Sequence, residues 1–374
     1  MLTHIFRSTV IVAVVLSFAN VIAAPPNMKI ESTPFGKTAS GEDVTRFELF
    51  NSHGHSISVM NWGASLLDVN VPDRDGKLAN VNLSFETLEP YLDGHPYFGS
   101  TVGRFCNRIA EGKFAIDGKE YSVTLNAGKH HLHGGKTNFT YQNWAGESYE
   151  TDNAVGVRFQ LTSPDGQEGY PGTVKATVDY QWNDDNELRI AFSAITDAPT
   201  HVNLCNHSYW NLGGAGSGSA MDHIALIEAD QSLDVDEDLI PSGQLNGVDG
   251  TVLDFRKPTA IGDRIGELTA TKGYDHCYVI RGQAGTLRPA ARVVDPKTGR
   301  VLEIETTQPG MQLYTGNHLP GDESSNGYGG HEAFCLETQH YPNTPNRDNF
   351  PSTLLKPGEE LNEVTVHRFS VERQ

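Results

Sequence analysis

The sequence predicts an all-β protein whose antiparallel sheets pack as a large β-sandwich. Three consecutive segments, residues 155–161, 174–182 and 188–194, place apolar side chains at every second position, which is the period of a half-buried strand. The connections between them, PDGQEGYPG and NDDN, are rich in residues that favour chain reversal. We therefore expect these segments to form an antiparallel meander.

Two further observations support the same fold class. Asp-Gly pairs close to apolar residues, at Asp117-Gly118 and Asp75-Gly76, are typical of tight β-hairpins. No long amphipathic stretch with helix caps is visible, and the 38 glycines and 19 prolines are spread through the chain rather than gathered in one linker. We expect residues 24–374 to form a single domain of packed sheets.

Residues 1–23 have the layout of a secretory signal peptide. Arg7 precedes an apolar run over residues 10–18, and Val21 and Ala23 supply the small-x-small pattern of a cleavage site. The run is much shorter than the ~20 residues of a membrane-spanning helix. We expect cleavage after Ala23, export to the periplasm or the extracellular space, and no membrane association of the mature chain.

The composition excludes several classes of partner and cofactor. A net charge of -19 disfavours nucleic acids, because phosphate binding requires a basic patch. The four cysteines lack CxxC spacing, which argues against a zinc ribbon or a redox pair, and the sequence leaves their disulfide state open. We expect a monomer or a weak dimer that binds a small molecule.

Five short segments combine polar side chains with aromatic residues or glycine. They are GRFCNRI (103–109), HHLHGG (130–135), NLCNHSYWNL (203–212), GYDH (273–276) and FCLETQHYP (334–342). In the first, Arg104, Asn107 and Arg108 offer guanidinium and amide groups that suit sugar hydroxyls as well as carboxylates. Surface arginines on an edge strand are the alternative interpretation.

The histidine-rich second segment could indicate a metal site. Zinc needs three or four ligands, however, and no HExxH-type partner appears in the sequence, so we expect no metal. Gly134 and Gly135 instead indicate a bend that allows close approach of a ligand or a neighbouring strand, and that leaves His133 pointing into a site.

The third and fifth segments supply a candidate acid and a candidate base. His207, with a reference pKa near ~6.5, can donate and recover a proton at neutral pH. Residues two apart on a strand share a face, so Cys335 flanks Glu337 and Cys277 flanks Asp275, and desolvation should raise the pKa of both carboxylates. A buried structural histidine and a solvated surface glutamate are the alternatives. Tyr209 and Trp210 offer flat faces for a sugar, or simply core packing.

These segments, in this order, resemble the motifs of the aldose 1-epimerase (galactose mutarotase) family. GRFCNRI is similar to the family's GR-x-x-N-R-I, HLHGG to its LHGG, NLCNHSYWNL to its N-L-x-N-H-S-Y-x-N-L, and TTQPGMQLYTGN with FCLETQHYPN to its C-terminal pair. The resemblance implies a large antiparallel β-sandwich with an open sugar cleft. It also implies an isomerase that interconverts the α and β anomers of free hexoses such as galactose and glucose, without cofactor or metal.

The resemblance also implies roles for individual residues. His207 matches the general acid and Glu337 the general base; the positions that hold the sugar match Asn107, Arg108, His133 and Asp275, and Gln312 matches a further polar contact near the base. For this chemistry the base must be ionised while the acid is protonated. We therefore expect nearby carboxylates, Asp275 in particular, to raise the pKa of His207.

The chain departs from the family pattern at three positions. Cys205 stands where threonine is common, Trp210 where phenylalanine is common, and His130 where asparagine is more usual. We expect the last two departures to affect which hexose fits.

Three other functions compete with this interpretation. A carbohydrate-binding sandwich could keep the cleft without catalysis. A glycoside hydrolase would use two carboxylates across the glycosidic bond. A hexose-phosphate epimerase would need a phosphate site, for which only Arg104 and Arg108 are candidates. The pairing of a histidine with a carboxylate favours the epimerase acting on free sugars.

Overall fold

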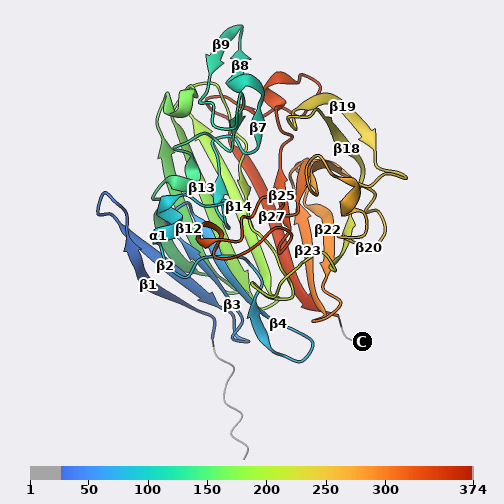
Figure 1. Cartoon of the computed structure of the whole chain (residues 1–374). Helices are drawn as coiled ribbons and strands as arrows, with labels where there is room; N and C mark the ends of the chain where they lie inside the picture. The colour runs from blue at the N-terminus through green and yellow to red at the C-terminus, as the bar shows by residue number, and fades with distance from the viewer. Residues whose placement is uncertain (1–26, 373–374) are drawn as a thin grey trace, which may run out of the picture.

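Antiparallel strands make up nearly all of the regular secondary structure in this computed structural model, which describes residues 27–372 (Figure 1). The predicted leader lies outside the described residues, so its cleavage and the export of the chain stay predictions. No helix among the described residues is long and apolar enough to span a membrane. The helical elements are α1 (Glu89–Asp93) and 3₁₀ turns at Ala110–Gly112, Phe139–Tyr141, Gln167–Gly169, Ile265–Glu267, Glu323–Ser325 and Thr344–Asn346.

The largest sheet has nine strands and contains the predicted meander. Residues 155–161, 174–182 and 188–194 all lie in strands that pair antiparallel with their neighbours in the chain, as expected. In spatial order the strands are β11 (Ala145–Glu150), β12 (Ala154–Ser163), β13 (Val174–Asn183), β14 (Glu187–Thr196), β27 (Leu361–Val371), β23 (Arg300–Thr306), β22 (Arg288–Val294), β17 (Ile224–Ile227) and β20 (Thr259–Ala260). The C-terminal strand β27 thus joins the two halves of the sheet.

Two five-stranded sheets accompany this large sheet. The N-terminal one has the order β1 (Lys29–Lys37), β2 (Asp43–Phe50), β3 (Ser56–Met60), β4 (Ser65–Pro72) and β5 (Leu78–Asn80). The other has the order β19 (Pro241–Gly247), β18 (Ala229–Val235), β21 (Asp275–Ile280), β24 (Gly310–Tyr314) and β25 (Cys335–Gln339). The turn at Asp75-Gly76 connects β4 to β5, as the sequence predicted.

Four short antiparallel strand pairs lie in the segments that connect the large sheets. They are β6 (Thr101–Val102) with β16 (Cys205–Asn206), β7 (Arg108–Ile109) with β10 (His131–Leu132), β8 (Lys113–Ile116) with β9 (Lys119–Ser122), and β15 (Thr200–His201) with β26 (Leu354–Leu355). The predicted hairpin at Asp117-Gly118 joins β8 to β9, with positive φ at both turn residues, as a type I′ turn requires. Two of these pairs, β6–β16 and β7–β10, lie next to candidate site residues.

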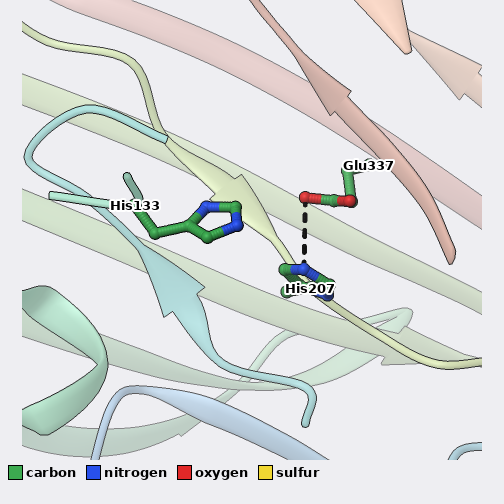
Figure 2. A group of neighbouring side chains, drawn as sticks. All are labelled: His133, His207 and Glu337. Carbon is green, nitrogen blue, oxygen red and sulfur yellow. Dashed lines mark ion pairs between the residues drawn. The ribbon is translucent and has the colours of Figure 1, made fainter. Parts of the chain in front are cut away.

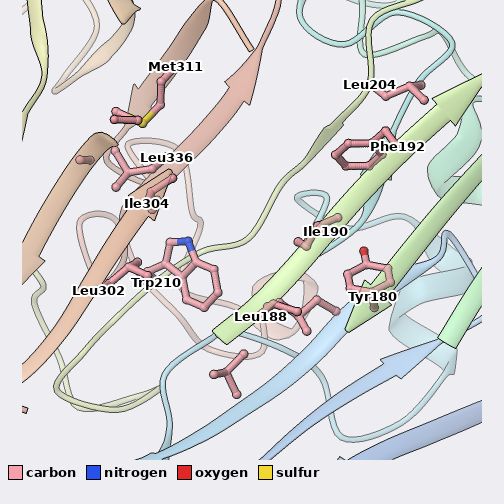
Figure 3. Packing of buried hydrophobic residues seen from close by; sticks show 14 of the residues in the cluster. Tyr180, Leu188, Ile190, Phe192, Leu204, Trp210, Leu302, Ile304, Met311 and Leu336 are labelled. Atoms are coloured by element: carbon pink, nitrogen blue, oxygen red, sulfur yellow. The ribbon is translucent and has the colours of Figure 1, made fainter. Parts of the chain in front are cut away.

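One apolar core lies between the sheets. Its buried side chains come from the inner faces of all three large sheets, for example Val59 of β3, Ile190 of β14 and Leu336 of β25. Figure 3 shows the part of this core around Trp210, which is fully buried among strands of the nine-stranded sheet and the β24–β25 pair. The shared core confirms the predicted all-β sandwich. That residues 24–374 form one domain stays a prediction.

Arg104, a predicted site candidate, is a structural residue instead. The residue is 2% exposed, and its guanidinium donates hydrogen bonds to the carbonyl oxygens of Ser163, Pro164, Pro171 and Gly172, at 3.2, 3.1, 3.0 and 2.8 Å. Burial lowers the pKa of Arg104 to about 10, so it stays charged at neutral pH. The side chain therefore ties the loop between β12 and β13 to the segment that follows β6.

Replacing Arg104 should destabilise the fold strongly. We expect Arg104→Ala to lower the free energy of unfolding by about 3 kcal/mol or more, because four carbonyl oxygens lose a charged donor inside the protein. Urea denaturation measures this quantity. Arg292→Ala is the control, because Arg292 makes only exposed ion pairs with Glu303 and Glu372 and should contribute less than about 1 kcal/mol. Equal effects of the two changes would contradict the structural role of Arg104.

Candidate active site

The backbone around His207 is fixed by short-strand pairing. His207 follows β16, which pairs with β6, and its own N–H donates to the carbonyl oxygen of Ser100 at 2.9 Å. The carbonyl oxygen of His207 accepts from the N–H of Gly99 at 3.0 Å. His207 is 4% exposed, and the two backbone hydrogen bonds hold its segment in place. The local sequence thus presents one histidine at a defined place.

Glu337 lies in the middle of β25, inside a regular antiparallel ladder. It pairs with Gln312 of β24, and Gln312 pairs in turn with Cys277 of β21. Only 2% of Glu337 is exposed. Cys205 donates a long hydrogen bond from Sγ to Oε2 of Glu337, 3.7 Å away. All four cysteines are buried and unpaired by disulfides, which answers the question that the sequence left open.

His207 and Glu337 face each other, as Figure 2 shows. The distance from Nε2 of His207 to Oε2 of Glu337 is 3.6 Å. Both side chains line a cavity of about 210 Å³ that opens to solvent. The other residues that line it are Pro96, Tyr97, Asn107, Arg108, Leu132, His133, Tyr209, Asp275, Tyr314, His318 and Leu319. The structure therefore brings together the two residues that were assigned as acid and base.

Four of the five predicted sugar-binding residues also line this cavity: Asn107, Arg108, His133 and Asp275. Nη2 of Arg108 lies 3.8 Å from Oδ2 of Asp275, so a cation and an anion share one wall. Gln312 does not line the cavity. Its Nε2 donates to Oδ1 of Asp275 at 2.6 Å, which places Gln312 behind Asp275 as a support for that carboxylate.

The glycines after His133 allow the close approach that the sequence indicated. A Cβ atom on Gly134 would lie 2.0 Å from the carbonyl oxygen of Gly103, and one on Gly135 would lie 2.1 Å from Oε2 of Glu168. Both glycines have positive φ, as does His133 itself at 51°. The chain therefore turns sharply and directs His133 into the cavity, as expected.

Burial sets the pKa values of the acid–base pair. It raises the pKa of Glu337 to about 8, with a further contribution from the negative charge of Asp275. It lowers the pKa of His207 to about 4, because a charged imidazole loses its hydration in the cavity. The expectation that carboxylates raise the pKa of His207 was wrong: desolvation dominates, and Asp275 acts on Glu337 instead.

Between these two pKa values, the pair holds a single proton. A neutral His207 beside a protonated Glu337 contains as many protons as an imidazolium beside a carboxylate, and the two forms differ only in where that proton sits. Since Nε2 and Oε2 are 3.6 Å apart, beyond the range of a direct hydrogen bond, the proton passes between them when the two side chains move closer or an oxygen atom bridges them. The site can therefore supply one acid and one base together.

One group of side chains has the spacing of a metal site. His133, His207 and Glu337 each offer one ligand atom, and these atoms lie within 4.8 Å of one another. Nδ1 of His133, however, accepts a hydrogen bond from the backbone N–H of Asn107 at 3.2 Å, so a neutral His133 carries its proton on Nε2. That nitrogen is then a hydrogen-bond donor rather than a metal ligand, and the three residues do not fit a zinc ion well.

Two predicted effects on sugar selectivity are not supported by where the residues lie. Trp210 is fully buried and packs on His367 and Phe369 in the core, away from the cavity. His130 does not line the cavity, and its Nε2 lies 3.5 Å from Oδ2 of Asp238. Neither residue can select between hexoses by contact.

Sequence reasoning missed several of the cavity's walls, above all Tyr97. Its ring lies 4.7 Å from that of His133 and 5.8 Å from that of His207. Tyr314, His318 and Leu319 were also missed. A signal for Tyr97 was present in the run HPYFG, where two aromatic residues stand between a proline and a glycine, a composition typical of a shaped loop.

Comparison with known proteins gives a consistent result. A family model described as aldose 1-epimerase matches residues 45–368. Galactose mutarotase of Bos taurus is 45% identical over 88% of this chain and 94% of its own length. Aldose 1-epimerase of Escherichia coli (strain K12) is 34% identical over 89% of this chain and 97% of its own.

Solved structures agree with the sequence matches. The crystal structure of galactose 1-epimerase from Lactobacillus acidophilus NCFM matches with a TM-score of 0.84 at 28% identity, and the match covers 93% of this chain and all of that one. An aldose epimerase homologue from C. elegans matches with a TM-score of 0.80 at 31% identity, over 87% of this chain and 98% of that one. Since the five motif segments all contribute to one cavity and the similarity spans most of the sequence, the chain belongs to the aldose 1-epimerase family.

Proposed function

We propose that this protein is a cofactor-independent aldose 1-epimerase that interconverts the α and β anomers of a free hexose such as galactose or glucose. One observation above all supports the proposal: the buried side chains of His207 and Glu337 face each other at a cavity that opens to solvent. The relatives named galactose mutarotase and aldose 1-epimerase support the same reaction.

The reaction opens a hemiacetal and closes it on the other face. The carboxylate of Glu337 takes the proton of the anomeric hydroxyl while the imidazolium of His207 protonates the ring oxygen, and the bond between that oxygen and the anomeric carbon breaks. The resulting aldehyde rotates about its bond to the next carbon. As the ring closes, Glu337 returns its proton to the carbonyl oxygen while His207 takes its proton back from the hydroxyl that had been the ring oxygen, so atoms and charges balance without a cofactor.

The pKa values define what must happen before ring opening. At neutral pH, the proton of the pair resides mainly on Glu337, because the pKa of Glu337 is raised and that of His207 is lowered. The reactive form arises when this proton passes to His207. Arg108 favours that transfer, because its positive charge lowers the pKa of Glu337.

The remaining cavity residues hold the sugar. Asp275 accepts hydrogen bonds from sugar hydroxyls, and Gln312 keeps its carboxylate in place. Nε2–H of His133 donates to a sugar oxygen, since its Nδ1 is occupied by the backbone of Asn107. Arg108 and the side chain of Asn107 complete the polar wall.

The geometry disfavours the alternative functions. A sugar-phosphate enzyme needs a phosphate site, yet Arg104 is committed to backbone carbonyls and Arg108 is close to Asp275. A glycoside hydrolase needs two carboxylates across the bond that breaks, whereas the group facing Glu337 is an imidazole. A purely sugar-binding protein has no use for two ionisable groups buried against each other.

Removing either member of the pair should abolish catalysis. We expect Glu337→Gln and His207→Asn each to lower the rate by roughly 10²-fold or more, the usual contribution of general acid–base catalysis. The change in optical rotation of freshly dissolved α-D-galactose or α-D-glucose measures that rate. Glu31→Gln and His53→Asn are matched controls on exposed side chains. No acceleration by the parent protein would favour the sugar-binding function, and release of reducing ends from a glycoside would favour the hydrolase.

The pH dependence should report a pair with one proton. We expect kcat/KM, corrected for spontaneous mutarotation, to be highest between about pH 4 and about pH 8. Below this range a second proton leaves no ionised base, and above it the loss of the last proton leaves no acid. Asp275→Asn should move the alkaline limit to lower pH, because the charge of Asp275 raises the pKa of Glu337. A profile that rises continuously beyond pH 8 would contradict the single-proton form.

Metal removal tests the remaining alternative for this cavity. Because the hydrogen bond from Asn107 leaves the proton of His133 on Nε2, we expect dialysis against EDTA to leave the mutarotation rate unchanged. Elemental analysis of the dialysed protein accompanies the rate measurement. A loss of activity that added Zn²⁺ restores would show that the three residues bind a metal for catalysis.

A further inference from the structure

Two tyrosine rings lie nearly parallel to the imidazole of His207. The centroid of Tyr209 is 5.0 Å from that of His207 with an angle of 14° between the planes, and the corresponding values for Tyr97 are 5.8 Å and 17°. Both tyrosines line the cavity together with His207. Tyr314 differs, since its ring is 6.5 Å away and nearly perpendicular, at 82°.

The backbone fixes both parallel rings. Tyr209 is two residues beyond His207, its carbonyl oxygen accepts from the N–H of Leu83 at 2.9 Å, and the residue is 3% exposed. Tyr97 has a left-handed backbone conformation, with φ of 65°, and its carbonyl oxygen accepts from the N–H of Ser100. Because Ser100 also accepts from the N–H of His207, the segment that holds Tyr97 is tied directly to the segment that holds His207.

The mechanism needs a charged imidazole in a place that disfavours charge. Burial is the main reason why the pKa of His207 is low. The titratable and charged groups around its ring are Glu337 of β25, His133 after β10, His95 and Tyr97 ahead of β6, Tyr209, and Tyr314 of β24, with Asp275 and Arg108 on the cavity wall. Of these, only Glu337 and Asp275 can offer a negative charge, and Arg108 opposes them.

The faces of aromatic rings are a second kind of group that can stabilise a cation. The face of a tyrosine ring carries negative electrostatic potential and attracts a cation within about 6 Å of its centroid. Tyr97 and Tyr209 meet that limit, whereas Tyr314 does not. The attraction grows when water is excluded, as it is around the buried His207.

We propose that Tyr97 and Tyr209 are positioning residues that stabilise the protonated imidazole of His207 through their ring faces and so allow the proton of the pair to pass from Glu337 to His207. The inference rests on the acid–base roles proposed above. It adds two residues, Tyr97 and Tyr209, that support the acid–base pair without exchanging a proton themselves. Each ring lowers the cost of forming the imidazolium while it holds the imidazole plane in place.

Leucine substitutions remove the ring faces. We expect Tyr97→Leu and Tyr209→Leu each to lower kcat by about tenfold, the size of a desolvated cation–π contact. The acid limit of the kcat/KM profile should move to lower pH by up to about one unit, because the imidazolium becomes harder to form. The alkaline limit should stay at the same pH, because it is set by the pKa of Glu337. Tyr97→Phe and Tyr209→Phe keep the face and should keep the acid limit.

A direct titration separates this inference from the proposed function. NMR of protein labelled at histidine, with the His207 signal assigned by its absence in His207→Asn, reports the pKa of His207 without any sugar. Tyr97→Leu and Tyr209→Leu should lower that pKa. Tyr314→Leu is the matched control, since it opens the same cavity but removes a ring beyond cation–π reach, and it should leave the pKa in place.

Should a leucine variant fail to fold, fluorinated phenylalanines at position 97 keep the shape of the ring while they weaken its negative face. The pKa of His207 should then fall stepwise with the number of fluorines. A pKa that stays constant in the leucine and fluorinated variants overturns the inference, even if activity falls. If the pKa falls as expected but the parent protein does not accelerate mutarotation, the stabilisation by the two rings stands and the proposed function is wrong.

Discussion

The opposition of His207 and Glu337 inside a desolvated cavity is the constraint on which the rest of the site depends. Taking both groups out of water changes the pKa of each in the direction that favours its neutral form. The cavity therefore starts from an uncharged pair, and every nearby charged group affects how easily that pair becomes charged. Asp275 raises the pKa of Glu337 and Arg108 lowers it, and the resulting pKa is about 8.

The fold could be predicted from local pattern because its strands are mostly half-buried. β13 and β14 alternate buried and more exposed residues along most of their length, so the period of two was visible in the sequence. The Asp-Gly turns were recognisable because Gly76 and Gly118 have positive φ, as does Asp117. The edges of the sheets and the short pairs such as β6–β16 were not predicted, because two-residue strands have no period and depend on contacts between distant segments.

The candidate site was predicted residue by residue only where motifs were recognisable. His207, Glu337, Asn107, Arg108, His133 and Asp275 all meet at the cavity, whereas Arg104, Gln312, Trp210 and His130 do not line it. Adjacency in the chain misled the interpretation of Trp210, which lies in the core although its neighbour Tyr209 lines the cavity. Arg104 and Arg108 reach different surroundings because Asn107, between them, has a positive φ that breaks the alternation of an extended strand. The direction of the His207 pKa shift was wrong because a sequence shows which charges exist but not how far water is excluded from them.

The ladder that holds Glu337 makes the site unusually sensitive to strand register. In β21, β24 and β25, the residues Cys277, Gln312 and Glu337 stand opposite one another, while Leu313 and Leu336 pair on the core side. A shift of β25 by one residue would turn Leu336 toward the sugar and send a carboxylate into the hydrophobic interior. Insertions or deletions within these strands are therefore far more damaging than in the loops around the cavity, and new sugar preferences in relatives of this chain should arise by loop variation over an unchanged ladder.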